Sequence, residues 1–273
     1  MTTNAPLRAL VTGATGGVGR ATCHALIEDA RHAGRQAVLA VAASSRGAAL
    51  DALVLELTAA GARAFGLHAD LGDAAACEQL AADAVAACDG LDVLVSNAGA
   101  MAGGPLLTLP VEHWNRIFDL DTRATWLLAR AAYPALEHSR GNVVAIASMA
   151  GLQPFPNSGA YSASKAALIM LCRQLAQEWA PVGIRVNSVS PGMLRTPMTE
   201  SLYQNDEVRT QRERLVPLGR IGTPQDVAQA VCFLAGAGAG YVTGIDLRLD
   251  GGVCDRLFGL IPGLPAPRPA PPA

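Results

Sequence analysis

Short apolar runs alternate along this chain with longer segments of helical periodicity. The apolar runs lack a strict alternation of apolar and polar residues, which is typical of strands that are covered on both faces. The predicted strands are 7–12, 37–43, 62–69, 91–97, 142–148, 184–190 and 245–249, and the predicted helices cover about 18–33, 46–60, 73–88, 111–138, 159–180 and 224–236.

This alternation predicts an α/β fold: a single doubly wound (Rossmann) domain, with a central parallel sheet of about seven strands and helices on both faces. The chain has 273 residues, of which 51% are hydrophobic and 16% are charged, so it can bury a large core. We assign residues 1–255 to this domain and 256–273 to a proline-rich C-terminal tail. The tail ends in "PGLPAPRPAPPA", which predicts an extended segment; a proline-rich ligand for a partner domain is the alternative.

Composition excludes several classes of function. The formal net charge is −2 and aromatic residues make up 4%, so neither a dense basic patch nor a set of base-stacking side chains indicates nucleic-acid binding. The six cysteines are scattered without a C-x-x-C pair, which indicates free thiols in a reducing cytoplasm and no metal site. We find neither a secretory signal nor an apolar run of about 20 residues, and we expect a cytoplasmic protein without membrane association.

A glycine-rich loop follows the first predicted strand in "TGATGGVGR", residues 12–20. A sharp turn, a backbone that approaches a pyrophosphate closely and a helix N-terminus aimed at the anion are what a dinucleotide site requires. Gly13 suits the turn, Gly17 the close approach and Gly19 the packing of the helix. The spacing is not G-x-G-x-x-G, and an ordinary tight turn is the alternative. The predicted cofactor contacts of this loop are Gly13, Thr15, Gly16, Gly17, Val18 and Gly19.

Two further strand ends carry residues suited to the same ligand, because ligands of such sheets bind beyond the carboxyl ends of the strands. "NAG" at 97–99 gives Asn97, Ala98 and Gly99, and "HADL" at 68–71 gives Asp70 and Leu71. Asp70 is suited to accept a hydrogen bond from an adenine amino group. Alternatively it caps the next helix, although Asp73 could fill that role.

Together, "TGATGGVG", "NAG", Ser148, "YSASK" at 161–165 and "NSVSPGMLRTPM" at 187–198 resemble the classical short-chain dehydrogenase/reductases over about residues 7–253. The resemblance, which includes the 3-oxoacyl carrier-protein reductases, implies an oxidoreductase that moves a hydride between a nicotinamide cofactor and a carbonyl or secondary alcohol. It also implies a small-molecule substrate and a homo-oligomer, a tetramer or a dimer. The cofactor contacts that it adds after the sixth strand are Pro191, Gly192, Leu194 and Thr196.

Tyr161 and Lys165 are four residues apart, so on a helix they share one face. A phenol with its ordinary pKa of about 10 is a poor base at neutral pH. A nearby cation favours the phenolate, desolvation opposes it, and an oxidised nicotinamide adds a second positive charge. We therefore predict that Tyr161 is the general acid/base, that Lys165 assists it, and that both residues also contact the cofactor. For the pair alone, an exposed helix with a weak Tyr–Lys contact would be the default interpretation.

Two more positions complete the predicted catalytic group. Ser148 lies 13 residues before Tyr161, which is the family's spacing for the serine that hydrogen-bonds the substrate carbonyl. The family also has a tryptophan, six residues and an asparagine that helps to hold a water in a proton relay. Here Trp114 is followed at that place by Asp121, which cannot donate a hydrogen bond when ionised. Asp121 either serves the relay in altered form or braces the site locally while catalysis slows.

The preference between cofactors depends on the end of the second strand. An acidic residue there would bind the ribose hydroxyls of NAD. The segment "VAASSRGAAL" at 41–50 contains no carboxylate. Ser44, Ser45 and Arg46 are suited instead to a 2′-phosphate, and we predict NADP(H) over NAD(H). The alternative is that Arg46 is a solvated residue in the first turn of the next helix and does not bind the cofactor.

The substrate is not fixed by the sequence. The segments 100–107, 151–158 and 194–216 are predicted to close the site, the last as a lid helix. Apolar walls from Leu152, Phe155, Met193 and Tyr203 would suit an apolar ketone or an acyl thioester, unless these side chains pack locally. The alternatives to a carbonyl reductase are a sugar or steroid dehydrogenase, or a dinucleotide-binding sensor or partner protein that has lost turnover.

Overall fold

Seven parallel strands form one sheet in the order β3-β2-β1-β4-β5-β6-β7. The computed structural model describes residues 5–101 and 103–261. Because β1 lies between β2 and β4, the crossovers leave it in opposite directions, and a crevice is expected at the carboxyl ends of these strands. The strands are β1 (Leu7–Thr12), β2 (Ala37–Ala43), β3 (Arg63–His68), β4 (Val93–Ser96), β5 (Asn142–Ile146), β6 (Arg185–Pro191) and β7 (Asp246–Leu249).

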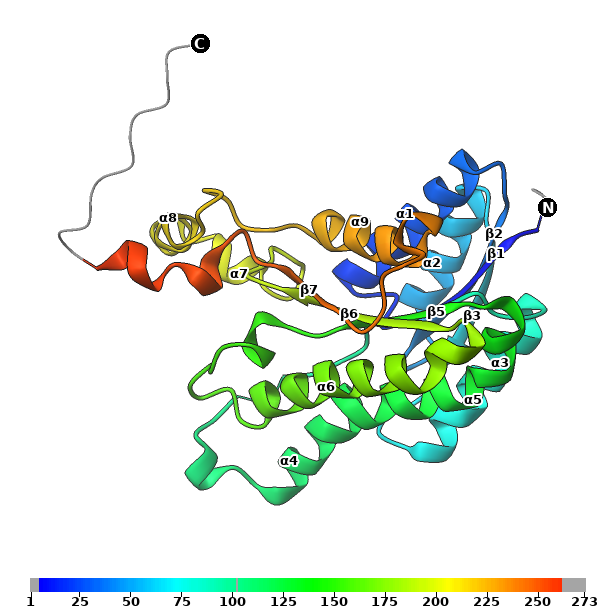
Figure 1. Cartoon of the computed structure of the whole chain (residues 1–273). Helices are drawn as coiled ribbons and strands as arrows, with labels where there is room; N and C mark the ends of the chain where they lie inside the picture. The colour runs from blue at the N-terminus through cyan, green and yellow to red at the C-terminus, as the bar shows by residue number, and fades with distance from the viewer. Residues whose placement is uncertain (1–4, 102, 262–273) are drawn as a thin grey trace, which may run out of the picture.

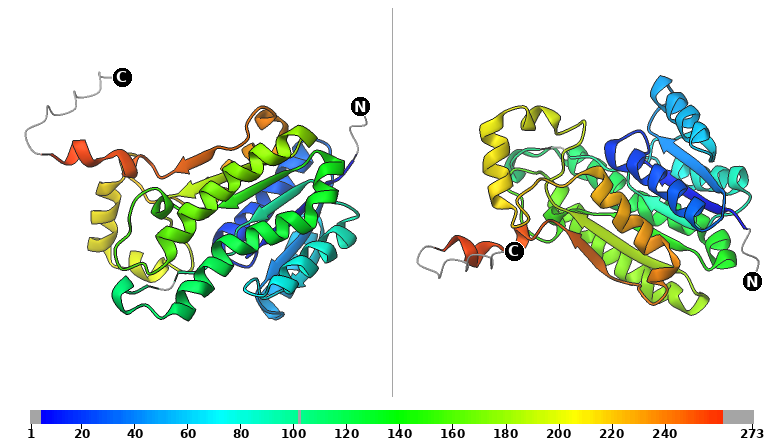
Figure 2. Two further views of the ribbon diagram at one scale, coloured as in Figure 1. Left: turned by 60° about the horizontal axis from the view of Figure 1, so that its bottom comes forward. Right: turned by 90° about the horizontal axis from the view of Figure 1, so that it is seen from above.

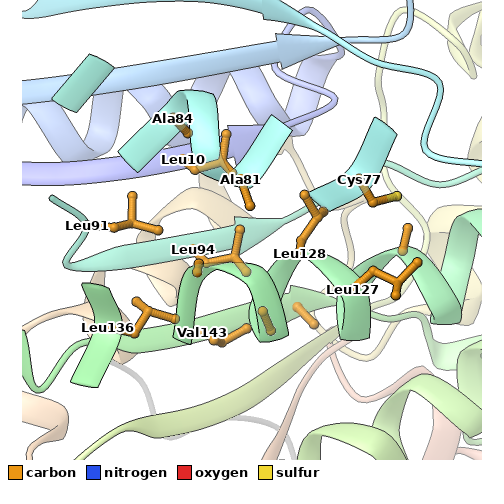
Figure 3. Close-up of a cluster of buried hydrophobic side chains, with 14 of the residues drawn as sticks. Leu10, Cys77, Ala81, Ala84, Leu91, Leu94, Leu127, Leu128, Leu136 and Val143 are labelled. Atoms are coloured by element: carbon orange, nitrogen blue, oxygen red, sulfur yellow. The ribbon is translucent and has the colours of Figure 1, made fainter. Parts of the chain in front are cut away.

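Helices cover both faces of the sheet (Figures 1 and 2). One face buries its apolar side chains against α1 (Gly17–His32), α2 (Ala48–Ala59) and α9 (Pro224–Ala235). The other packs against α3 (Ala74–Cys88), α5 (Ala124–Ser139) and α6 (Tyr161–Trp179). Figure 3 shows part of this second core, where leucines of β4 and α5 interdigitate with small residues of α3.

The predicted strands and most predicted helices are confirmed, with ends that differ by at most two residues. Short 3₁₀ turns add Leu106–Thr108, Met149–Gly151, Ala180–Val182, Ala237–Ala239, Val253–Asp255 and Leu257–Leu260. The last of these lies within the predicted tail, and residues 262–273 lie outside the described residues. No helix in the described ranges is long and apolar enough to cross a bilayer.

Two helix predictions need correction. The segment 111–138 is not one α-helix: α4 (Val111–Phe118) and α5 are joined by a π-helical turn, Asp119–Arg123. Such a turn inserts a residue without breaking the helix, and here it coincides with the buried, hydrogen-bonded side chain of Asp121. The predicted lid helix within 194–216 is two short helices, α7 (Glu200–Tyr203) and α8 (Asp206–Leu215). Asn205 separates them and caps α8 by accepting from the N–H groups of Glu207 and Val208.

Candidate active site

The glycine loop folds tightly back on the start of α1. Gly13 has φ +60°, and a Cβ atom there would lie 2.9 Å from Nδ2 of Asn97. A Cβ on Gly19 would lie 2.3 Å from the carbonyl oxygen of Gly13 and 2.7 Å from Cα of Ala14. Both positions therefore require glycine. No side chain caps the N-terminus of α1 at Gly16, so its first N–H groups remain available to an anion.

Gly17 was predicted to let a cofactor approach closely, but the atoms nearest to it in the structure come from another segment of the same chain. A Cβ atom at Gly17 would lie 3.0 Å from Cδ of Pro197 and 3.4 Å from Cβ of Thr196. The segment after β6 thus lies against the glycine loop. This contact brings Thr196, a predicted cofactor contact, to the first turn of α1.

Thr12 joins this loop to the end of β4 and was not singled out from the sequence. Its buried hydroxyl accepts the N–H groups of both Asn97 and Ala98, each at 3.0 Å. The Asn97 amide in turn donates to the carbonyl oxygens of Thr12 at 2.9 Å and Gly13 at 3.1 Å. The side chain of Asn97 therefore holds the glycine loop in place, and Ala98 and Gly99 follow it at the sheet edge.

Lys165 is buried at the carboxyl end of β5, where it is only 4% exposed. Its Nζ donates to the carbonyl oxygen of Ile146 at 3.0 Å, the last residue of the strand. Nζ also lies 5.7 Å from the centroid of the Tyr161 ring, so the two side chains share one face of α6 as their spacing predicted. Tyr161 is the first residue of α6 and is partly exposed.

Asp121 enters this group from the π-helical turn and is 1% exposed. Its Oδ1 accepts the N–H of Ala100 at 2.9 Å and lies 3.8 Å from Nζ of Lys165. Its Oδ2 accepts from the hydroxyl of Ser164 at 2.9 Å. A Cβ on Gly99 would lie 2.8 Å from Oδ1 of Asp121 and 3.1 Å from Nζ of Lys165, so only glycine fits between them. The structure therefore places Asp121, the residue that differs from the family pattern, beside the predicted catalytic residues Tyr161 and Lys165.

Ser148 lies two residues beyond Ile146 and begins a 3₁₀ turn. Its Oγ accepts the N–H of Ala150 at 3.1 Å, which leaves the hydroxyl proton free to be donated. The turn packs directly on the catalytic helix, because a Cβ on Gly151 would lie 2.8 Å from the carbonyl carbon of Lys165. Gly151 and Ser164 are contributors that the sequence did not reveal, since their role depends on contacts between distant segments.

Comparison with known proteins identifies relatives of this chain. A family model described as enoyl-(acyl carrier protein) reductase matches residues 13–254. A 3-oxoacyl-[acyl-carrier-protein] reductase of Synechocystis is 37% identical over 90% of this chain and 96% of its own length, and dehydrogenase/reductase SDR family member 4 of Bos taurus is 34% identical over 91% and 88%. The chain belongs to the classical short-chain dehydrogenase/reductase family.

A solved structure of a related protein has a similar fold. A crystal structure of a putative NAD(P)-dependent gluconate 5-dehydrogenase from Beutenbergia cavernae, with bound NADP, is 36% identical, covers 92% of this chain and 98% of its own, and has a TM-score of 0.81. The short-chain dehydrogenase/reductase assignment makes the chain an NAD(P)-dependent oxidoreductase.

The residues predicted to bind the adenosine part of the cofactor in this short-chain dehydrogenase/reductase are more exposed. Ser44, Ser45 and Arg46 are exposed at the carboxyl end of β2, just before α2. Asp70 is half-exposed and accepts from both Nη atoms of Arg116, at 2.7 and 3.2 Å, and from the N–H of Gly72. The Arg116 guanidinium and this N–H hold the pKa of Asp70 below its usual range. Asp73, and not Asp70, caps α3 by accepting from the N–H groups of Ala75 and Ala76, so the alternative role of Asp70 as a helix cap is wrong.

The remaining predicted cofactor contacts lie along the segment after β6. Pro191 ends the strand, and Gly192 approaches the chain so closely that a Cβ would lie 2.8 Å from Cα of Asp250. Leu194 pairs with Gly222, and the N–H of Thr196 donates to Oγ1 of Thr199 at 2.9 Å. Within the described ranges of this short-chain dehydrogenase/reductase, no group of three or more His, Cys, Asp or Glu residues could hold a metal ion.

Proposed function

We propose that this chain is an NADP(H)-dependent oxidoreductase that interconverts a carbonyl compound and a secondary alcohol, with Tyr161 as general acid/base. The observation that carries the proposal is the buried Lys165, fixed by Ile146 on the face of α6 that also presents Tyr161. A cation held beside a phenol stabilises the phenolate and so lets the phenol exchange its proton near neutral pH.

The glycine loop fits a dinucleotide because Gly13 and Gly19 leave no room for a Cβ and the N-terminus of α1 has no capping side chain. Ala98, Gly99 and Thr196 would lie along the same ligand. Bound there, the nicotinamide cofactor supplies the hydride in reduction and accepts it in oxidation. Tyr161 would give its phenolic proton to the carbonyl oxygen, and Ser148 would polarise that oxygen with its free O–H.

The preference for NADP(H) is supported by Ser44, Ser45 and Arg46, which are exposed beyond β2 in a segment without a carboxylate. A guanidinium and two hydroxyls suit a phosphate better than a ribose diol. The Beutenbergia cavernae structure described above contains NADP.

Tyr161→Phe tests the proposal. The variant should lose at least about 10²-fold in kcat for ketone reduction while it still binds NADPH, because the proton donor alone is removed. Tyr133→Phe is the matched control, since Tyr133 is on α5, where its hydroxyl donates to Glu137 and its ring packs on Trp179 at the other end of α6 from Tyr161. A Tyr161→Phe enzyme with unchanged turnover would contradict the assignment.

A second candidate is a dinucleotide-binding sensor with little turnover. It is favoured by one observation, the buried carboxylate of Asp121 at 3.8 Å from Lys165, which offsets the charge that the tyrosine needs. NADPH binding without turnover of any ketone, thioester or alcohol in a broad panel would support this candidate.

A further inference from the structure

Two loops beside the candidate active site contain no charged residue. The segments 99–111 and 149–164 lead from β4 to α4 and from β5 into α6. They are joined by backbone hydrogen bonds: the N–H of Gly104 donates to Asn157 at 2.8 Å, and the N–H of Gly159 donates to Gly104 at 3.0 Å. The described residues of the two loops therefore form an uncharged wall next to Ser148 and Tyr161.

Large apolar side chains stand exposed on this wall and on the segments at the same end of the sheet. Figures 1 and 2 place these segments at the end where β5 and β6 finish, with α7 and α8 on one side of that end and the turn before α4 on the other. Leu107 is 94% exposed and Met198 is 86% exposed. We name this set the apolar rim: Met101, Leu106, Leu107, Leu152, Phe155, Met198, Leu202, Leu215 and Leu218.

Tyr203 is not part of this rim. The sequence placed it among the candidate walls, but it is 1% exposed and packs with Val216 and Ile221 beneath α7 and α8. Local packing is the alternative that the structure supports for Tyr203, and it anchors α7 and α8 through their inner side.

Charge along the rim is balanced within the chain. Residues 194–226 contain five arginines and five acidic residues. Arg195 binds both carboxylate oxygens of Glu200, at 2.8 and 2.6 Å, and Arg220 binds both of Asp226 at 2.7 Å. Arg212 and Arg214 have no ion-pair partner among the described residues; Arg212 donates to the hydroxyl of Tyr203 at 3.4 Å, and Arg214 is exposed at the end of α8. Glu207 and Glu213 are likewise outside these ion pairs, so the segment presents no net positive charge to an anionic substrate.

From these contacts we infer the substrate class, an inference that rests on the proposed function. The substrate is a neutral carbonyl compound, or its alcohol, whose carbonyl bears a long aliphatic or alicyclic group that lies on the apolar rim. Exposed apolar surface of this extent next to a reactive site gains free energy when a ligand covers it. A polyhydroxylated ketone would instead lose hydrogen bonds to water there without replacement, because the rim offers apolar side chains.

A homologous series of methyl ketones, from 2-butanone to 2-decanone, tests the inference with NADPH as the second substrate. Each methylene taken from water onto the rim should raise kcat/KM roughly fourfold until the rim is covered. Phe155→Ser and Leu107→Ser should flatten this dependence. Leu55→Ser is the matched control, because Leu55 is an exposed leucine on α2 outside the rim, and it should leave the dependence unchanged.

The outcomes separate the inference from the proposed function. A flat series, or faster reduction of a polyhydroxylated ketone or of a phosphate-bearing acyl thioester, would overturn the inference and leave the oxidoreductase intact. If no compound is reduced, the proposed function fails. The substrate class is then decided by the affinity of the same ketones for the Tyr161→Phe complex with NADPH, followed by cofactor fluorescence. Affinity that rises with chain length supports the inference, and affinity independent of chain length overturns it.

Discussion

Oδ1 of Asp121 lies 3.8 Å from Nζ of Lys165, and both side chains are almost completely buried. The carboxylate does not hydrogen-bond the ammonium; it bonds Ala100 and Ser164 instead, while Lys165 bonds Ile146. The two charges balance each other across a short gap in a region of low dielectric. A neutral asparagine at this position would leave the lysine charge unbalanced, so the carboxylate of Asp121 lowers the positive potential at Tyr161.

Asp121→Asn should therefore change the pH dependence of turnover. Without the carboxylate, the positive potential around Tyr161 rises, and alcohol oxidation should reach its plateau at a lower pH. The free energy of unfolding should fall by about 1–3 kcal/mol, because the Ser164 hydroxyl and Lys165 lose an ionised partner. Urea unfolding and pH–rate profiles measure the two effects.

Ser164→Ala is the control for this substitution. It removes the hydrogen bond to Oδ2 of Asp121 but keeps the charge. It should lower stability and leave the pH–rate profile in place. Equal displacement of the profile in both variants would show that Asp121 acts by bracing the site and not by its charge.

Arg46→Ala should reverse the preference for cofactor. Loss of charge-assisted hydrogen bonds to a 2′-phosphate would lower kcat/KM for NADPH about 10- to 100-fold and leave NADH nearly unaffected. Arg31→Ala is a suitable control, since Arg31 is an exposed arginine on α1 that pairs with Glu28. Equal effects on the two cofactors would remove Arg46 from phosphate recognition.

Gly19→Ala should weaken both cofactor binding and the fold. The new methyl group would lie 2.3 Å from a backbone oxygen of Gly13, so the loop must move, at a cost of about 1–3 kcal/mol. Gly238→Ala introduces the same methyl group where no atom lies within 4 Å. Thermal unfolding and NADPH titration should separate the two variants, and similar behaviour would contradict the steric argument.

Asp226 should make the free energy of unfolding depend on pH in the acid range, below about pH 4. The bidentate Arg220 contact, followed by bonds from Thr223, holds the pKa of Asp226 well below its usual range. A carboxylate whose pKa is lower in the folded state stabilises the fold above the unfolded value of about 4, and this contribution is lost as pH falls further. Asp226→Asn should cost about 1–2 kcal/mol at pH 7 and progressively less below pH 4.

Arg220→Gln provides the partner for a double-mutant cycle in urea. Once the arginine is replaced, Asp226→Asn should cost less than in the native chain, because the main ionic contact is already absent. Strictly additive losses would mean that the helix cap from Thr223, and not the ion pair, carries the effect.

The sheet could be predicted closely because its strands are apolar on both faces and separated by helices of regular period. Tyr161, Lys165 and Gly19 were likewise placed by local rules, since helical spacing and a tight turn act within a few residues. The π-helical turn at 119–123 could not be predicted from the sequence. The hydrogen bonds that accompany it join Asp121 to Ala100 and Ser164, which are 21 and 43 residues away along the chain. The pairing of Asp70 with Arg116 was missed for the same reason, at a separation of 46 residues.

The hydrogen bond from Lys165 to Ile146 has a consequence for any attempt to improve this protein. The lysine both donates to the last carbonyl oxygen of a buried central strand and supplies the cation beside the tyrosine. Stability and the proposed proton transfer by Tyr161 therefore depend on the same side chain, and we expect a substitution of Lys165 to impair both. Substitutions that raise thermal stability without loss of activity are consequently expected at other positions in the chain.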